Sequence, residues 1–410
     1  MKLDRILTTR RLNYAFIAGA ALWFAWVVSS ILGPGNMDMA GQVIGTDYLQ
    51  FYAAGVTLRQ GHSPDLYNFD FQSQLEKTIA GSELTSFHAF ITPPFLAWLF
   101  VPLSLLPYTW SFIVWSLLGL LFLWISIKLL SAERPFKGLL WSLTWFPIFA
   151  ALSFGQNSIL SLLFLSLTYW LWRKDKFFEA GLVSSLLLFK PQMVLGLGLL
   201  WLLEWRKSWR SLLGLAIGGG ILAGLCFWLL PDASRSYISI ARNFLPVMIY
   251  QKQFPLWHMH SLRGFWTLLL PGQTWLVEGL SLILSAAGIA AYIVFWRKNR
   301  QDFKLLFAGA ICLTIWITPH AMIYDWSILL IAAILLWQTL PWLHAMLKPI
   351  FATIWIATFF SGPLTFLQLK ILPIAIQISM PVLLLVLFTV FRYTSSKSLP
   401  DTQQLIQEKP

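Results

Sequence analysis

The sequence predicts an all-α integral membrane protein that crosses the bilayer many times. Hydrophobic residues make up 58% of the chain and charged residues only 11%, against roughly a quarter charged in a soluble domain. Long apolar runs recur from Leu12 to Phe391, and a span needs about 20 apolar residues. The 23 Trp residues often lie near the ends of these runs, as at membrane interfaces. We therefore interpret residues 1–392 as one membrane domain, followed by a polar tail at 393–410.

About twelve spans are expected, together with helices that do not cross. The first apolar run, 12–33, is too long for the core of a cleaved signal peptide, so we expect it to remain as a span. The runs Pro93–Leu106 and Leu262–Leu270 are too short, and we expect both to dip into the membrane without crossing. The expected spans are 12–33, 108–130, 138–152, 156–172, 178–190, 192–204, 209–230, 273–296, 303–318, 321–340, 347–360 and 371–391.

The basic residues predict the orientation. Clusters at both ends and between spans hold 21 of the 29 Lys and Arg residues, and positively charged loops stay in the cytoplasm. Both termini are then cytoplasmic and residues 34–92 face outward, with six acidic and two basic residues. The net charge of +12 thus reports topology, not nucleic-acid binding. The basic N-terminus and the compact loops favour a bacterial plasma membrane.

The first outer loop, 34–92, is expected to contain two helices lying in the membrane interface. Asn68 is placed to cap a helix over Phe69–Ala80, and Gly81 is placed to end it. A second helix is expected over Asp47–Gln60, with its apolar residues Tyr48, Phe51, Tyr52 and Val56 on one side.

Five polar elements fall on the outer side under this topology and predict a common site. They are the segment beginning at Asp47, the turn 153–157 with Gln156 and Asn157, the segment 189–192 with Lys190, the loop 232–261, and the loop 318–325.

Asp47 is the first candidate, and two compatible interpretations stay open. The carboxylate can cap the following helix, together with Thr46. It can also act as a general base on an acceptor hydroxyl, because Tyr48 and Tyr52 would partly desolvate it at the membrane surface.

Lys190 is the second candidate, since apolar residues flank it on both sides. A Lys at membrane depth implies a partner or a ligand, such as a phosphate, unless its side chain extends to a nearby interface.

The remaining candidates lie in the two late outer loops. His320 and Asp325 flank Tyr324, and they can bind substrate, position a phosphate or cap the helix after Pro319. His258, His260 and Arg263 suit a phosphate or sugar, because no nearby acid or Cys completes a metal set and Arg offers a planar fork. No metal or cofactor is expected.

Other small and reactive residues fit structural roles. Cys226 and Cys312 fall inside apolar runs with neither metal nor disulfide spacing. Gly214, Gly218 and Gly224 are spaced for close helix packing.

The sequence contains no nucleotide-binding motif and no soluble nucleotide-binding domain. An activated sugar donor must therefore arrive within or beside the bilayer, and a polyprenyl-phosphate sugar meets that need.

Several motifs resemble those of glycosyltransferase family 87. Asp47-Tyr48-x-x-Phe51-Tyr52-x-x-Gly55, Gly61-x-x-Pro64-x-x-Tyr67, Pro93-Pro94-Phe95 and Pro102-Leu103-x-x-Leu106-Pro107 resemble its first outer loop. Gly155-Gln156-Asn157, then Gly181 with Lys190-Pro191, then Pro319-His320 with Tyr324-Asp325 follow in the family's order. Thr92 departs from the pattern, since the family often has an aromatic residue there.

The resemblance implies a GT-C fold and a metal-independent, inverting sugar transfer. It implies that Asp47 is the base and that His320 contacts the donor phosphate. On this hypothesis a hexose, mannose by resemblance, passes from a polyprenyl-phosphate donor to a lipid-linked or envelope-glycan hydroxyl. Lys190, His320 and Arg263 would stabilise the leaving phosphate.

Two other functions remain open. A lipid or solute transporter would also be polytopic, although such proteins usually keep ionisable groups near mid-membrane. A non-catalytic subunit of an envelope assembly would show no effect of Asp47 on sugar transfer.

Overall fold

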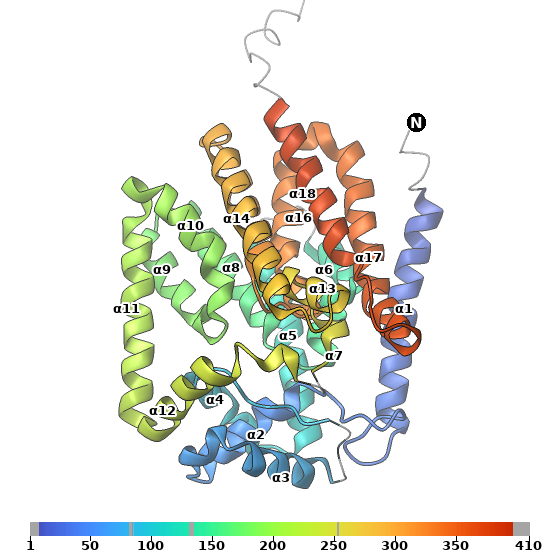
Figure 1. Ribbon diagram of the computed structural model, residues 1–410, viewed down its shortest axis with the longest axis vertical. Coiled ribbons are helices and arrows are strands. Elements are labelled where there is room, and N and C mark those ends of the chain that lie inside the picture. The colour runs from blue at the N-terminus through green and yellow to red at the C-terminus, as the bar shows by residue number, and fades with distance from the viewer. Residues whose placement is uncertain (1–7, 82–83, 85, 131–134, 252–253, 397–410) are drawn as a thin grey trace, which may run out of the picture.

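The computed structural model describes residues 8–81, 84, 86–130, 135–251 and 254–396, and within these ranges it contains helices and no strand. Long helices run along the molecule, and short helices gather at one end (Figure 1). The α-helices are α1 (Thr9–Leu32), α2 (Tyr48–Arg59), α3 (Phe69–Ala80), α4 (Phe95–Phe100), α5 (Tyr108–Leu129), α6 (Pro135–Leu143), α7 (Phe146–Ser153), α8 (Ser158–Arg173), α9 (Phe177–Ser185), α10 (Leu195–Leu203), α11 (Trp205–Leu229), α12 (Pro231–Ser239), α13 (Leu262–Leu269), α14 (Thr274–Lys298), α15 (Phe303–Ile317), α16 (Leu329–Thr339), α17 (His344–Ile371) and α18 (Ser379–Ser396).

Within the described residues, five helices are long and apolar enough to cross a membrane: α1, α5, α11, α14 and α17 with the turn before it. The apolar pair α6 and α7 would make a sixth, but its two halves are bent by 78°. Further apolar helical segments are 10–17 residues long, and several of them, including α8 and α15, supply buried residues of the hydrophobic core. The prediction of an all-helical membrane protein is therefore confirmed, while the number of about twelve spans stays a prediction.

Several expected spans are divided or extended. The expected span 138–152 is broken where Pro147, in the first turn of α7, starts a new helix. The expected end of a span at 360 is wrong, because α17 continues to Ile371. The polar residue Ser361 is tolerated inside this helix because its hydroxyl bonds to that of Ser379, 3.2 Å away. In the region of the expected span 371–391, the helix α18 correspondingly begins at Ser379.

The first loop, residues 34–92, packs into a hydrophobic cluster that it shares with Phe112 and Trp115 of α5. The prediction for α3 is confirmed: Asn68 accepts the N–H of Phe71, and Gly81 ends the helix at φ +73°. The interfacial prediction for α2 is wrong, because nine of its twelve residues are buried within the protein. The short run after Pro93 forms α4, which covers α2 with Phe100 stacked on Phe51 at 5.1 Å. The run Pro93–Leu106 thus forms α4 and a short 3₁₀ turn, Leu103–Leu105, and packs against α2.

Glycines bring α9 and α11 together. A side chain at Gly214 would strike the backbone of Phe178, and one at Gly218 would strike Ser185, so their predicted packing role is confirmed. Gly224 has open space around its Cα, and the packing prediction is wrong there. Cys226 and Cys312 are both free thiols in the interior or close to it.

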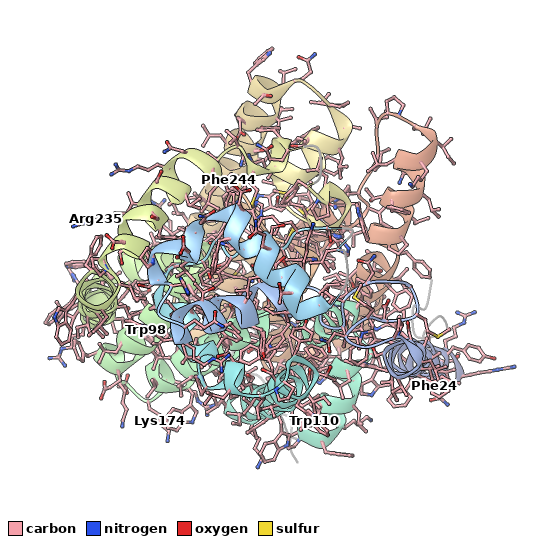
Figure 2. The ribbon with its side chains drawn as sticks, turned by 90° about the horizontal axis from the view of Figure 1, so that it is seen from below. Phe24, Trp98, Trp110, Lys174, Arg235 and Phe244 are labelled. Carbon is pink, nitrogen blue, oxygen red and sulfur yellow. The ribbon has the colours of Figure 1, made fainter. Side chains whose placement is uncertain are left out.

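The two ends of the described chain lie at the same end of the molecule. α1 begins and α18 ends opposite α2, α3 and α12 (Figure 1). α1 stands at the edge, and Phe24 points away from the other helices (Figure 2). The helices α2 and α3 of the first loop thus lie at the end of the molecule opposite these two chain ends.

Candidate active site

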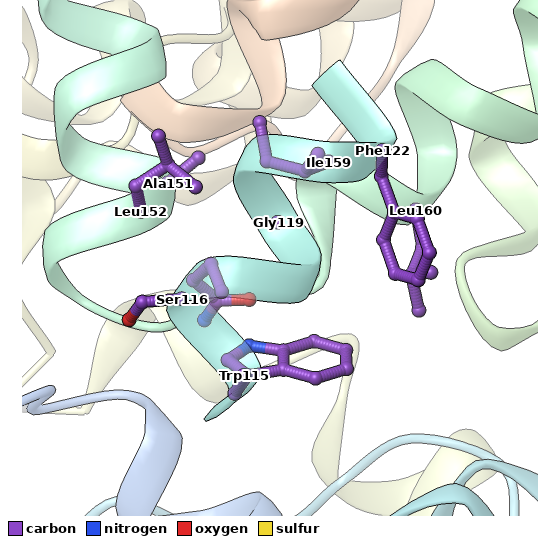
Figure 3. A pocket seen from close by; sticks show the side chains of 9 residues that line it. Trp115, Ser116, Gly119, Phe122, Ala151, Leu152, Ile159 and Leu160 are labelled. Atoms are coloured by element: carbon purple, nitrogen blue, oxygen red, sulfur yellow. The ribbon is translucent and has the colours of Figure 1, made fainter. Parts of the chain in front are cut away.

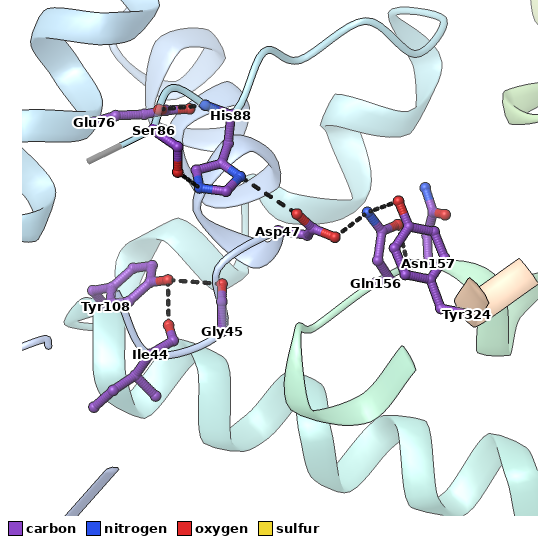
Figure 4. Close-up of polar contacts among 10 residues, drawn as sticks. All are labelled: Ile44, Gly45, Asp47, Glu76, Ser86, His88, Tyr108, Gln156, Asn157 and Tyr324. Atoms are coloured by element: carbon purple, nitrogen blue, oxygen red, sulfur yellow. Dashed lines mark hydrogen bonds and ion pairs between the residues drawn. The ribbon is translucent and has the colours of Figure 1, made fainter. Parts of the chain in front are cut away.

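Asp47 connects four segments that are distant in the sequence. Its Oδ1 lies 3.4 Å from Nδ1 of His88, and its Oδ2 accepts a hydrogen bond from Nε2 of Gln156 at 3.0 Å. The same Gln156 amide donates to the Tyr324 hydroxyl at 3.1 Å. The start of α2, the loop before α4 and the turn between α7 and α8 therefore meet at the Asp47 carboxylate, and the segment before α16 joins them through Gln156 (Figure 4).

The predicted capping role of Asp47 is wrong. Asp47 occupies the N-cap position of α2, but its side chain makes no capping hydrogen bond. The first N–H of the helix, on Tyr48, donates instead to the carbonyls of Gly45 and Phe154, at 2.7 and 2.9 Å. The carboxylate is turned instead toward His88 and Gln156, and each of its oxygens faces one of these two side chains.

The surroundings keep Asp47 ionised. Burial by itself would raise the pKa of Asp47, but the hydrogen bond and charge of His88, with the Gln156 bond, lower it below its ordinary value. Burial opposes the charged form of His88, yet the Asp47 carboxylate and Glu76 raise the pKa of that imidazole. The two side chains are only 19% and 17% exposed, so water screens their interaction weakly.

A tight turn at Gly155 positions Gln156 next to Asp47. Gly155 has φ +67°, and a Cβ there would lie 2.5 Å from the Cβ of Tyr48. The carbonyl of Gly155 accepts the indole N–H of Trp115 at 2.9 Å. This left-handed, tightly packed position favours glycine and points the next side chain at Asp47.

Asn157 follows in the same turn and is fully buried. Among the residues that the structure describes, neither its side-chain oxygen nor its nitrogen has a hydrogen-bond partner. An unsatisfied buried amide is costly, by about 1–3 kcal/mol. Asn157 therefore has unused hydrogen-bonding capacity next to Gln156.

Lys190 has a partner inside the protein. Its ammonium group lies 2.7 Å from Oδ1 of Asp325 and 3.1 Å from the Ser158 hydroxyl, which itself donates to Asp325 at 2.7 Å. Lys190 stands at a break between two 3₁₀ turns, Leu186–Phe189 and Pro191–Val194. The side chain is 12% exposed and is directed at Asp325 and Ser158 inside the protein. The predicted need for a partner is confirmed.

Asp325 also organises its own loop. Its Oδ2 accepts the N–H of Met322 at 3.0 Å, which caps the 3₁₀ turn Ile323–Ile328. The capping role predicted for this loop therefore belongs to Asp325.

His258 and His320 lie in neighbouring loops, which are joined by a bridge between Met259 and Met322. Burial lowers the pKa of each imidazole to about 4, and nearby carboxylates, Asp47 and Asp325 respectively, offset this in part. Both rings are therefore neutral at neutral pH. The His258 ring lies 5.8 Å from that of Phe154 in the turn that carries Gln156.

His260 and Arg263 have hydrogen-bond partners within the protein. His260 bonds to the Ser379 hydroxyl at 2.7 Å and is fully buried, and burial lowers its pKa to about 3. Arg263 pairs with Glu278 and donates to the carbonyl of Pro246 at 2.7 Å.

Tyr48 and Tyr52 have their hydroxyls occupied. That of Tyr48 is 2.5 Å from the Ser111 hydroxyl, and that of Tyr52 donates to the carbonyl of Leu106 at 2.8 Å. Both are buried and pack against the ring of Tyr108.

Sequence reasoning missed His88, Glu76 and Ser158. His88 lies in an unremarkable stretch, SFHAF, between an acidic helix and the Pro93 pair. Nothing in its spacing points to Asp47. Its importance comes from the folding of the first loop, which returns the chain to the start of α2.

A small pocket opens beside Gln156 (Figure 3). Its lining includes Trp115, Ser116 and Leu160, and the hydroxyl of Ser116 has no hydrogen-bond partner within the described residues. The free volume of about 10 Å³ is close to the volume that one water molecule needs, and it is far too small for a sugar.

Within the described ranges, no group of three or more His, Cys, Asp or Glu residues is arranged to hold a metal ion.

Comparison with known proteins gives one match. The model of glycosyltransferase family 87 matches residues 90–319, more than half of the chain. The matched region contains Gln156, Lys190 and Arg263, whereas Asp47 precedes it and His320 follows it. No curated protein and no solved structure matches the chain.

Proposed function

Because the chain belongs to glycosyltransferase family 87, we propose that it transfers a hexose, mannose, from a polyprenyl-phosphate donor to a hydroxyl of a lipid-linked or envelope-glycan acceptor. Transfer inverts the anomeric carbon. It takes place on the non-cytoplasmic face of a bacterial plasma membrane, in a GT-C fold of about twelve spans with both termini in the cytoplasm.

The observation that carries this proposal is the environment of Asp47. A general base needs a free lone pair, the charged form and a fixed direction. Gln156 and His88 each engage one carboxylate oxygen, and a carboxylate has about four lone-pair sites. Asp47 therefore keeps the capacity to accept a proton while its orientation is held from two sides.

The proposed reaction is a single displacement. Asp47 takes the proton of the acceptor hydroxyl as that oxygen forms a bond to the anomeric carbon. The bond from this carbon to the phosphate oxygen breaks on the opposite face. The electron pair leaves with the lipid phosphate, which departs as an anion. Base assistance of this kind contributes about 10²–10⁴-fold in rate.

Stabilisation of the leaving phosphate is assigned to Lys190, His320 and Arg263. Lys190 has three N–H donors and uses two on Ser158 and Asp325, which leaves one for a ligand. His320, with its pKa lowered to about 4 by burial, would offer a hydrogen bond from a neutral ring.

Contacts to the donor sugar are assigned to polar groups around Asp47. Asn157 fits best, because its buried amide has no partner in the described part of the chain. Gln156, Tyr324, Asp325, His258 and His260 complete the proposed donor side, and Tyr48 and Tyr52 shape the acceptor side. No cofactor takes part.

Family membership favours this function over a transporter. Experiment can distinguish this function from that of a non-catalytic subunit, because in a non-catalytic subunit Asp47 would be dispensable for sugar transfer.

The test is Asp47→Asn in reconstituted membranes, with a lipid-phosphate hexose as donor. Asn preserves size but cannot accept the proton. We expect normal insertion, nearly unchanged donor affinity and a transfer rate lower by about a hundredfold or more. A fully active Asn variant would reject Asp47 as the base. Absence of transfer by the wild-type protein from any polyprenyl-phosphate hexose would reject the donor class.

A further inference from the structure

His88 has two distinct ring contacts. Its Nδ1 faces Asp47 at 3.4 Å, and its Nε2 lies 3.1 Å from the hydroxyl of Ser86 (Figure 4). A neutral ring with its proton on Nδ1 donates to Asp47 and accepts from Ser86. A protonated ring donates at both positions. In either form the hydrogen-bond donor faces the carboxylate.

The backbone that carries His88 is fixed by α3. The N–H of His88 donates to Oε2 of Glu76 at 3.1 Å, and the N–H of Phe90 donates to the side chain of Gln72 at 2.9 Å. Glu76 and Gln72 are both buried. Two side chains of one helix thus hold the segment at residue 88 and at residue 90, so the position of the imidazole is built into the fold.

We propose that His88 is a positioning residue of this site, which holds the Asp47 carboxylate charged and directed at the acceptor hydroxyl. This rests on the proposed function, since it takes Asp47 as the base. His88 acts through Asp47 and stays off the path of the transferred proton.

The groups around the pair support this assignment. Asp47 is influenced by His88, His258, Tyr108, Tyr324 and the neutral amide of Gln156. Burial keeps His258 uncharged at neutral pH, with its pKa lowered to about 4. His88, which is influenced by Asp47 and Glu76, is therefore the group able to place positive charge beside the carboxylate.

Removal of His88 has a predictable direction. Burial is the largest influence on Asp47 and favours its protonated form. Without the imidazole, the pKa of Asp47 should rise, and the base should be lost progressively as the pH falls. At alkaline pH the carboxylate is ionised in either protein.

The first experiment measures Asp47 without any substrate. Purified full-length protein is labelled with a water-soluble carbodiimide, which reacts with protonated carboxyls, and the Asp47 peptide is followed by mass spectrometry across pH. In His88→Gln the labelling midpoint should move to higher pH. In His88→Lys, which restores a cation, it should return toward wild type. The control His62→Gln removes a half-exposed His that pairs with Asp65 in the same loop, and it should change nothing.

The second experiment measures sugar transfer by the same variants. His88→Gln should be severalfold slower at acidic pH, approach the wild-type rate at alkaline pH and keep its donor KM. An equal loss at every pH, or an unchanged labelling midpoint, would overturn the proposal. If the midpoint shifts but the wild-type protein transfers no sugar, the proposed function fails while the link between His88 and Asp47 stands.

Discussion

The ammonium group of Lys190 lies 2.7 Å from Oδ1 of Asp325, a residue 135 positions later in the chain. Asp325 is 3% exposed and also receives hydrogen bonds from Ser158 and Met322. The pair joins the break between α9 and α10 to the segment that leads into α16. The most unusual charge in the sequence is thus one half of a buried ion pair at the edge of the candidate site.

Breaking this pair should cost stability as well as activity. Lys190→Met leaves the Asp325 carboxylate buried without its cation, which typically costs about 3–5 kcal/mol. We expect a lower melting temperature in detergent and weaker use of the donor. Adding Asp325→Asn should recover stability but not donor use, because the phosphate contact stays absent. Lys174→Met, at the exposed end of α8, is the control. A Lys190→Met protein with wild-type melting and donor use would contradict both roles.

Glu76 should give the protein a distinctive pH dependence. Burial raises its pKa from 4.5 to about 7, so the folded protein retains a proton that the unfolded chain releases. The stability this provides is fully present below about pH 4.5 and is lost as the pH rises through about 7.

Glu76→Gln removes this titration and keeps an acceptor for the N–H of His88. Its melting temperature should therefore fall less than that of wild type between acidic and alkaline pH. Asp70→Asn, an exposed change in the same helix, should follow wild type. Parallel melting curves for Glu76→Gln and wild type would show that burial does not perturb this carboxyl.

Local signals in the sequence predicted several elements well. The cap and stop of α3 depend on Asn68 and Gly81, and short-range rules describe both. Composition also predicted the helical membrane class, because this class can be recognised without knowing which helices contact one another.

The contacts of the site could not be predicted in this way. Asp47 meets His88 and Gln156 across 41 and 109 residues, and these encounters depend on how α2 packs under α4 and against the turn at Gly155. From the sequence alone, an acidic residue such as Asp47 directly before a helix is expected to cap that helix. In the folded protein the first N–H of α2 instead donates to the carbonyl oxygens of Gly45 and Phe154, and the Asp47 carboxylate points away from the helix end.

The topology predicts labelling from opposite sides of the membrane. Single Cys residues are introduced at Ser63, in the first loop, and at Asn299, after α14, in a background without Cys226 and Cys312. In intact cells an impermeant thiol reagent should reach position 63 alone, and position 299 should react only after permeabilisation. Labelling of both from outside would reject the orientation and the outward-facing site.

Gly155 offers the sharpest test of the geometry around Asp47. Gly155→Ala forces an ordinary residue into φ +67° and places a Cβ 2.5 Å from that of Tyr48. Gly35→Ala, at φ +61° with nothing within 4 Å, is the matched control because it carries only the conformational cost of about 1–2 kcal/mol. The clash should move the turn and withdraw Gln156 from Asp47. We therefore expect Gly155→Ala to lose sugar transfer on the order of a hundredfold, as small misplacements of catalytic groups do, while Gly35→Ala keeps its rate. Equal rates for the two variants would mean that Gln156 does not orient the base.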